Sequence, residues 1–316
     1  MKKHKNNIAL VLGSGGARGL AHIGVIKALT KFKIPIDLVI GTSMGAFVGG
    51  FFCKGYSPVE MIKIALSVDK IFTLKMLVPS FPKFGIIDPE KIKVFLKQYL
   101  DDIKIEELKI PFFAVSTDLI SGGEIIFNSD SLVDAILSSI AVPGLIKPHF
   151  YQKRYFVDGG LVNPLPVSVA YKLKAKYIIA VNVTKSPIKI KLNYIKGNDR
   201  IDLLIKKLKQ SEFINKISDI LPDKILSNFL EERQRVSEPE YPSMIQTLLQ
   251  SFSIMENQLV NLYLRYFPPH ILINPPIQNF NMLEFYRAKE LIELGEKSTY
   301  SKIPQIKREL KKLQVT

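Results

Sequence analysis

The amino-acid sequence predicts an α/β protein with a mostly parallel central sheet. In the first half of the chain, short β-rich runs alternate with segments of helical periodicity. Turns rich in glycine follow the first two apolar runs and precede helical patterns. A chain of 316 residues is long enough to bury a large core. A sheet built from alternating strands and helices is covered by helices on both faces, which predicts three layers.

The first four elements form a βαβα unit. Ile8–Leu12 is a short apolar run typical of a buried strand, and residues 20–32 have the spacing of an amphipathic helix. Residues 38–40 predict a second strand, and Met44–Lys54 predicts a second helix. A strand, a helix and a further strand in this order pair in parallel.

The later elements are predicted from capping residues and periodicity. Asp88-Pro89-Glu90 starts a helix, because Asp is a good N-cap and Pro is tolerated at the first helical position. Its apolar stripe is formed by Ile92, Phe95, Leu96 and Tyr99. Further strands are expected at 111–115, 177–183 and 270–274. Within residues 161–175 a helix is expected to start after the prolines, and further helices are expected at 243–267 and 283–294, the last one ahead of a basic tail.

The sequence divides into three parts. We expect a catalytic core over residues 6–185, a lysine-rich insertion or subdomain over 186–242, and helices and a strand over 243–316 that complete the domain. Within the core, residues 69–88 are rich in Phe, Met, Leu and Pro but have no regular period. This segment is expected to be an irregular loop packed on the core, or an apolar lid or membrane-facing loop.

The composition favours an anionic partner. The 44 basic and 29 acidic residues give a formal net charge of +15, which would attract a phospholipid surface or nucleic acid. Genome composition alone can produce the same lysine bias. The lysines from Lys172 to Lys196 are not interleaved with aromatic residues at base-stacking intervals, so nucleic acid is not the expected partner.

Cysteine and histidine usage excludes several classes of site. The single cysteine, Cys53, cannot form an intramolecular disulfide, and the four histidines are too far apart for a local ligand motif. No metal and no cofactor are expected. The apolar run after the basic N-terminus is too short for an export signal, and no stretch of ~20 apolar residues could span a bilayer. We therefore expect a cytoplasmic protein with peripheral contact to the inner face of the membrane.

The first motif that carries chemistry follows the first strand. It is the run Gly13-Ser14-Gly15-Gly16-Ala17-Arg18-Gly19. Glycines at such a turn bring consecutive backbone N–H groups close to an anion at a helix N-terminus. Alone, the run also fits a dinucleotide phosphate loop, with Asp37 as the acid that binds the ribose.

The second motif follows the second predicted strand. Gly41-Thr42-Ser43-Met44-Gly45 matches the G-x-S-x-G elbow, in which a serine lies on a strained turn between a strand and a helix. The positive end of the following helix points at the developing oxyanion. The context indicates that Ser43 is a nucleophile rather than a structural turn residue.

Several residues could serve as its base. In an α/β-hydrolase an acid and then a histidine follow the serine, which makes His149 and His270 candidates. A structural role is the favoured interpretation for both. His22 follows the glycine loop by about one helical turn and is expected to pack beneath the site.

The third motif is Val157-Asp158-Gly159-Gly160. Together with the first two, in this order, it resembles the pattern of the patatin-like phospholipase family: a glycine-rich oxyanion loop, then GxSxG, then DG[GA]. The resemblance covers about residues 6–185 and the Phe285-Tyr286-Arg287-Ala288 region. The segments Ser116-Thr117-Asp118-Leu119, with Gly122, and Ser138-Ser139-Ile140-Ala141-Val142-Pro143-Gly144 also look like family segments. One departure is Ser14, where many relatives carry glycine.

The resemblance implies a three-layer α/β/α patatin-like fold, related to α/β-hydrolases, and a Ser-Asp dyad without histidine. Ser43 matches the nucleophile and Asp158 the base. Backbone groups around Gly15 and Gly16 match the oxyanion hole, with Arg18 as its basic flank and Met44 as the residue after the nucleophile. The remaining motif positions are Gly13, Gly19, Gly41, Gly45, Gly159 and Gly160.

The expected function is a serine acyl hydrolase of lipid esters, a phospholipase A or lysophospholipase that needs no cofactor. Three alternatives stay open at this point. An acyltransferase would use the same acyl-enzyme with another acceptor. A dinucleotide-binding oxidoreductase would use only the Gly13 to Gly19 loop. An inactive family member would bind acidic membranes or protein partners through its basic surface.

Overall fold

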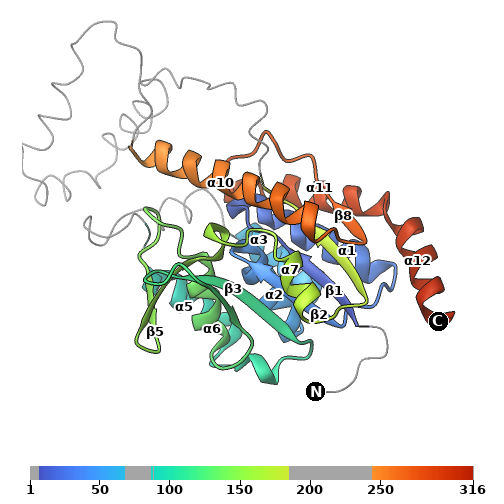
Figure 1. Cartoon of the computed structure of the whole chain (residues 1–316), viewed down its shortest axis with the longest axis horizontal. Helices are drawn as coiled ribbons and strands as arrows, with labels where there is room; N and C mark the ends of the chain where they lie inside the picture. The colour runs from blue at the N-terminus through green and yellow to red at the C-terminus, as the bar shows by residue number, and fades with distance from the viewer. Residues whose placement is uncertain (1–6, 68–86, 88, 185–243, 316) are drawn as a thin grey trace, which may run out of the picture. The chain divides into compact units, whose positions relative to one another are not determined.

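A computed structural model describes residues 7–67, 87, 89–184 and 244–315. Within these ranges the strands form one sheet in the order β5-β6-β3-β2-β1-β7-β8, with β4 paired to β3 (Figure 1). The strands that run parallel to one another are β1 (Ile8–Leu12), β2 (Leu38–Thr42), β3 (Phe112–Asp118), β7 (Tyr177–Val181) and β8 (Ile271–Ile273). The antiparallel strands are β4 (Glu124–Phe127), β5 (His149–Tyr151) and β6 (Arg154–Asp158). The predicted α/β class with a mostly parallel sheet is confirmed.

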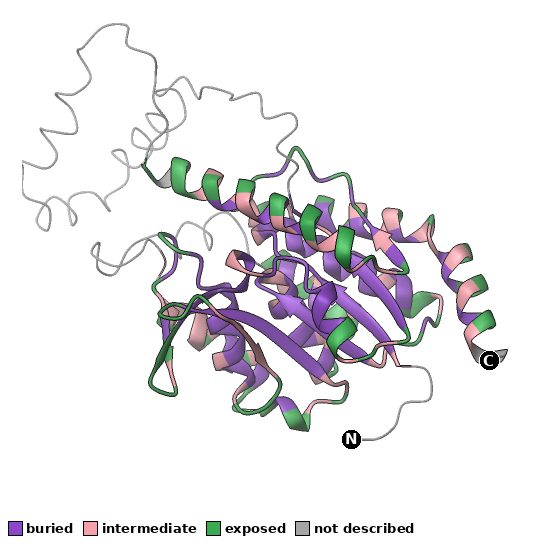
Figure 2. Cartoon of the chain, viewed as in Figure 1, coloured by how far each residue is buried: buried purple, intermediate pink, exposed green. Residues whose placement is uncertain are grey.

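The central strands β1, β2, β3 and β7 are buried on both faces. Leu10 and Leu12 of β1 belong to one hydrophobic cluster, whereas Ala9 and Val11 belong to another. Figure 2 shows these central strands as buried and the outer turns of α10 as exposed. The first cluster is covered by α1 (Ala21–Lys31), α2 (Met44–Lys54), α3 (Pro58–Ser67), α5 (Pro89–Leu100), α6 (Leu132–Ile140), α11 (Ala288–Tyr300) and α12 (Ile303–Val315). The second is covered by α7 (Val167–Lys172) and α10 (Met244–Tyr266). This is the three-layer α/β/α arrangement that the resemblance implies.

The strand register brings distant motifs to one edge of the sheet. Leu12 of β1 pairs with Gly41 of β2, so the glycine loop and the elbow both follow the carboxyl ends of neighbouring strands. Strand β6 runs in the opposite direction beside β3, and Asp158 at its end pairs with Ser116. Ligands of parallel sheets bind at this edge, which is therefore the expected position of the site.

The N-terminal elements agree with the sequence analysis. The strand Ile8–Leu12 and the helix Met44–Lys54 are confirmed, and the helix expected over 20–32 corresponds to α1. A 3-10 turn, Gly16–Leu20, precedes α1 because the glycine loop leads directly into the helix. The strands at 38–40, 111–115, 177–183 and 270–274 and the helix at 243–267 are confirmed with shifted ends.

The helix that was expected after the prolines of the 161–175 segment is confirmed as α7, which begins at Val167, directly after Pro166. A 3-10 turn, Gly159–Leu161, precedes these prolines. The helix prediction at 283–294 is wrong in its bounds. A 3-10 turn at Phe285–Arg287 precedes α11, which continues through Gly295 to Tyr300. A Cβ at Gly295 would lie 2.0 Å from the carbonyl oxygen of Ala21, so this glycine permits the close approach of α11 to α1. The basic tail that was expected after this helix forms α12.

Some elements were not foreseen. They are the helices α3 and α6 and the short strands β4, β5 and β6. The third motif begins in β6. The expected segments 69–88 and 186–242 lie outside the described residues, apart from Ile87.

By its contacts the chain divides into one unit of Met1–Pro187 with Thr247–Thr316 and a second unit of Ile188–Gln246. In the described ranges, none of the helices combines the length and the apolar character that crossing a bilayer requires.

Candidate active site

Ser43 lies on a strained turn between β2 and α2. Its backbone has φ 55° and ψ −121°, a conformation that costs a non-glycine residue about 1–3 kcal/mol. The flanking glycines are required by close packing: a Cβ at Gly41 would lie 2.5 Å from the amide nitrogen of Ala46, and one at Gly45 would lie 2.1 Å from the carbonyl oxygen of Leu12. The turn is therefore the nucleophile elbow that the G-x-S-x-G pattern predicts.

A second serine holds the backbone of this turn. The amide of Ser43 donates to the Ser139 hydroxyl at 2.8 Å, and that hydroxyl donates to the carbonyl oxygen of Val115 at 2.5 Å. Ser139 is fully buried on α6. Sequence reasoning noted its segment without giving it a role, and nothing in the local pattern distinguishes it from Ser138.

Ser43 and Asp158 form a direct hydrogen bond. The Ser43 hydroxyl donates to Oδ2 of Asp158 at 2.6 Å, and the amide of Gly160 donates to the other carboxylate oxygen at 2.7 Å. Asp158 is fully buried at the end of β6, and Ser43 is 4% exposed. The third motif therefore fixes the carboxylate with its own glycine amide and aims the second oxygen at the serine.

The environment raises the basicity of Asp158. Burial raises its pKa to about 7, although the hydrogen bonds from Ser43 and Gly160 act in the opposite direction. A general base is most effective when its pKa lies near the working pH. The Asp158 carboxylate is therefore suited to accept a proton from the Ser43 hydroxyl near neutral pH.

The glycine loop presents backbone amides beside Ser43. It is pinned by the amides of Gly13, Ser14 and Ala17, which donate to carbonyl oxygens at 3.1, 2.7 and 2.8 Å. The amides of Gly15 and Gly16 take no part in these three bonds. Gly16 has φ +57°, and a Cβ there would lie 2.4 Å from the Met282 side chain. Met44 is the first residue of α2, so its amide has no acceptor within the helix.

Arg18 acts on the loop in a way that the sequence did not predict. It was expected to be a basic flank, but its side chain is 1% exposed, and its Nε donates to the carbonyl oxygen of Gly15 at 3.0 Å. In a trans peptide the carbonyl and the following N–H point in opposite directions. By holding the Gly15 carbonyl, Arg18 fixes the direction of the Gly16 amide.

The histidines have partners other than Ser43. His22 lies beneath the loop, where Nε2 is 2.8 Å from the carbonyl oxygen of Gly13, and burial lowers its pKa to about 4. His149 Nε2 is 3.0 Å from Asp134 Oδ1. His270 Nδ1 accepts the amide of Ile178 at 3.1 Å. None of these three contacts involves Ser43 or Asp158.

Asp37 does not lie beside the glycine loop. It precedes β2, at the amino end of the strand, and its carboxylate accepts the amide of Ile8 at 2.7 Å. The loop follows the opposite, carboxyl end of β1. This position removes the acid that a dinucleotide-binding site would need and contradicts the oxidoreductase alternative.

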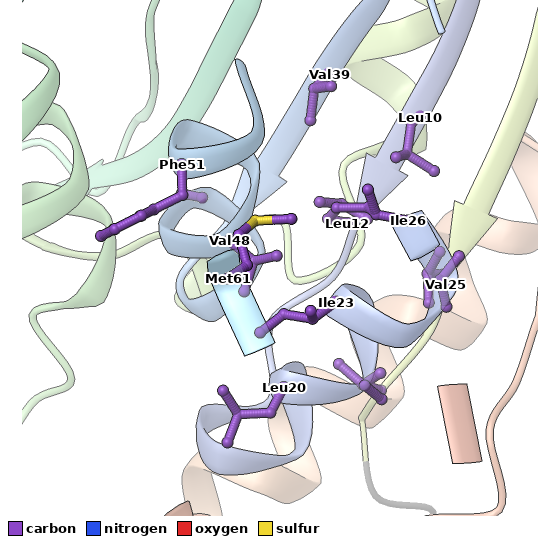
Figure 3. Packing of buried hydrophobic residues seen from close by; sticks show 14 of the residues in the cluster. Leu10, Leu12, Leu20, Ile23, Val25, Ile26, Val39, Val48, Phe51 and Met61 are labelled. Carbon is purple, nitrogen blue, oxygen red and sulfur yellow. The ribbon is translucent and has the colours of Figure 1, made fainter. Parts of the chain in front are cut away.

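An apolar pocket of about 200 Å³ opens beside Ser43. Met44, Phe47 and Phe51 line it from successive turns of α2, so it extends along this helix from Ser43. Figure 3 shows Ile23, Val48 and Met61, which also line the pocket, in the packing around α2. The other lining residues are Gly16, Leu20, Ile64, Ala65, Ile87, Ile92, Phe95, Ile140, Val142, Leu145, Ile146, Met282, Leu283 and Phe285.

The family model of patatin-like phospholipases matches residues 10–171, which include all three motifs. This chain belongs to the patatin-like phospholipase family. Family membership accounts for the order of the glycine loop, the elbow and the Asp158 motif on neighbouring strands.

Relatives within this family include bacterial and animal proteins. An uncharacterized NTE family protein of Mycobacterium bovis is 42% identical over 179 residues, which are 57% of this chain and 49% of the relative. The neuropathy target esterase sws of Drosophila melanogaster is 35% identical over 183 residues, 56% of this chain and 13% of that protein. The chain thus spans about half or less of the length of these relatives.

Among solved structures, VipD from Legionella pneumophila has the same fold. The match has a TM-score of 0.53 and 13% identity, and it covers 94% of this chain and 66% of VipD. The patatin-like fold predicted from the sequence is therefore confirmed.

Proposed function

We propose that this chain is a serine acyl hydrolase that cleaves fatty acyl esters of phospholipids or lysophospholipids. The observation that carries the proposal is the 2.6 Å hydrogen bond between Ser43 and Asp158 at the mouth of an apolar pocket. Membership of the patatin-like phospholipase family supports the same substrate class.

In the acylation step, the Ser43 oxygen attacks the ester carbonyl carbon while its proton moves to Oδ2 of Asp158. The negative charge that develops on the carbonyl oxygen is stabilised by the amides of Gly15, Gly16 and Met44. Removing one such donor typically raises the barrier by ~3 kcal/mol. Asp158 then returns the proton to the leaving alcohol, and an acyl group remains on Ser43.

In the deacylation step, water attacks the acyl-serine carbonyl and Asp158 accepts its proton. The collapse of the second tetrahedral intermediate releases the fatty acid and returns the proton to Ser43. Asp158 acts as base and acid in both halves of the cycle, so the histidines have no step to perform.

The pocket supports an acyl chain as the group that Ser43 receives. Phe51 follows Ser43 by eight residues, which corresponds to about 12 Å along a helix. An extended hydrocarbon lying along α2 would contact Met44, Phe47 and Phe51 in turn. Its burial contributes about 25 cal/mol per Å² of apolar surface. The polar head group would stay outside, near the carboxyl edge of the sheet.

The substrate would be met at a membrane surface. The net charge of +15 favours peripheral contact with an anionic leaflet, as the sequence analysis expects for a protein at the inner face of the membrane. Contact by residues 69–88 stays a prediction, because that segment lies outside the described residues.

Fatty acid release from phosphatidylcholine and lysophosphatidylcholine tests the proposal. Ser43→Ala should abolish release while thermal unfolding stays close to wild type, because the hydroxyl contributes little packing. Ser301→Ala, which removes an exposed serine hydroxyl at the end of α11, is the matched control and should keep full activity. Release by the Ser43→Ala variant at the wild-type rate would refute the nucleophile assignment.

A further inference from the structure

Helix α10 contributes a buried acid to the site. Glu256 is 0% exposed and lies one turn after the buried Phe252. It lies beyond residue 171, where the match to the family model ends. The sequence analysis assigned no role to it, because one Glu in an amphipathic helix is ordinarily a solvated residue.

The Glu256 carboxyl packs against the peptide that holds Asp158. A Cβ at Gly160 would lie 2.6 Å from Oε1 of Glu256 and 3.0 Å from Oδ1 of Asp158. Both carboxyl groups therefore contact the same glycine, whose amide is the hydrogen-bond donor to Asp158. Any residue larger than glycine at this position would push the two carboxyl groups away.

Glu256 also faces the glycine loop. The Arg18 guanidinium and the Ser14 hydroxyl lie near it, and each of them favours the charged form of Glu256. Among the described residues, neither carboxylate oxygen of Glu256 has a hydrogen-bond partner of ordinary geometry. The same is true of Nη2 of Arg18. Arg18, Glu256 and Asp158 thus form a buried row of ionisable groups behind Ser43.

Ionising both Glu256 and Asp158 would cost much free energy, because the two carboxyl groups are buried close to each other. Isolated buried carboxylates are strongly disfavoured, and two that are close to each other share a proton. Burial, together with the charge of Asp158, raises the pKa of Glu256 to about 8, although Ser14 and Arg18 oppose the rise. The two carboxyl groups therefore hold a proton more tightly than separate exposed carboxyl groups would, and their two ionisations are coupled.

We propose that Glu256 is a positioning residue of the catalytic site, which packs on the Gly160 peptide that holds Asp158 and couples its own ionisation to that of the base. The inference rests on the proposed Ser43–Asp158 dyad. Neutral Glu256 leaves Arg18 bound to the Gly15 carbonyl and Asp158 free to ionise. Ionised Glu256 attracts the Arg18 guanidinium, whose Nη2 has no hydrogen-bond partner among the described residues, and adds a negative charge beside the loop that receives the oxyanion.

The consequence is a bell-shaped dependence of acylation on pH. The rate should rise as Asp158 loses its proton near pH 7 and fall as Glu256 loses its proton near pH 8. In Glu256→Gln the neutral amide replaces the neutral acid, so the acid limb should stay in place. The alkaline limb should be lost, because the group that ionises there is gone.

The experiment is the rate of labelling by a fluorophosphonate probe between pH 5.5 and 9.5, measured with the full-length protein. Wild type and Glu293→Gln, which changes an exposed glutamate of α11, should give the bell-shaped profile. Glu256→Gln should plateau above pH 8. Glu256→Met has a side chain of similar length without a titrating group, so its labelling rate should also reach a plateau at high pH. This variant replaces Glu256→Gln in the experiment if the Gln variant does not fold.

Superimposable profiles for wild type and a folded Glu256 variant would overturn the inference and leave the proposed function intact. Failure of the proposed function has a different signature, because wild type itself would then not be labelled at Ser43. A loss of rate by the same factor at every pH would also count against the inference, since a purely structural role produces that result.

Discussion

At the scale of single residues, the site depends on bonds between residues that are far apart in sequence. Ser43 and Asp158 are separated by 115 residues, and Ser43 and Ser139 by 96. The first pair could be predicted, because each member lies in a short motif with glycines at fixed positions. Ser139 and Glu256 could not, because their roles come from the packing of α6 and α10 rather than from a local pattern.

Asp158→Asn should reduce ester hydrolysis about 10²–10⁴-fold, because an amide cannot accept the Ser43 proton. The double variant with Ser43→Ala should be little worse than either single variant, since residues of one catalytic unit fail together. The measurement is kcat/KM on a soluble ester, with folding checked by thermal unfolding.

His149→Ala and His270→Ala are the controls for this prediction. Their imidazoles contact Asp134 and the amide of Ile178, not Ser43, so both variants should keep substantial activity. A folded His149→Ala protein without turnover would replace the dyad by a triad.

At the scale of elements, close helix contacts explain where sequence reasoning about bounds was wrong. A glycine in a helical pattern is usually taken as a helix end, whereas Gly295 lies within α11. Gly24 of α1 has the matching role, since a Cβ there would lie 1.9 Å from the carbonyl oxygen of Ile292. The strand-turn-helix units were easier to predict, because the apolar runs of β1 and β2 and the glycines after them are all local signals.

Helix α3 forms one wall of the pocket, and it is a different element from the turn that carries Ser43. Ala65 lines the pocket and is 6% exposed. Ala65→Leu should reduce the volume available to an acyl chain, so long-chain esters should lose kcat/KM while an acetyl ester keeps it. The measurement is a chain-length series of p-nitrophenyl esters.

Leu66→Ala is the matched control for this series, because the neighbouring side chain is 50% exposed and does not line the pocket. Its chain-length profile should match wild type. If Ala65→Leu lowered activity on all esters equally, the pocket would not be the acyl site.

At the scale of the whole molecule, one sheet positions the residues of the candidate site. The α/β class followed from the alternation of elements in the first half of the chain. The antiparallel strands β4, β5 and β6 were harder to predict, because they are short and β4 and β5 are only partly buried. The pairing of β6 with β3 is nevertheless what brings Asp158 to the edge that carries Ser43.

The net charge of +15 should make the protein bind anionic vesicles more strongly than neutral ones. Each well-placed Lys or Arg contributes about 1 kcal/mol near an anionic leaflet. This part should weaken with salt, since the Debye length falls to ~3 Å at 1 M, whereas contact by apolar side chains should persist. Vesicle co-sedimentation across a salt series measures both parts.

A Phe81→Ser, Phe84→Ser variant separates the two contributions, because it removes apolar side chains of the 69–88 segment without changing the charge. It should lose the salt-resistant part of the binding. Equal binding of both proteins at every salt concentration would contradict membrane contact by residues 69–88. The net charge would then reflect genome composition alone.

The central claim, that Ser43 is an acylated nucleophile activated by Asp158, is tested most directly by the site of covalent modification. The protein is treated with a fluorophosphonate ester at neutral pH, digested, and the modified residue is identified by mass spectrometry. The account predicts one phosphonate on Ser43 in wild type, none in Ser43→Ala, and strongly slowed labelling of Ser43 in Asp158→Asn. Modification of another serine, or undiminished labelling of Ser43 in Asp158→Asn, would contradict it.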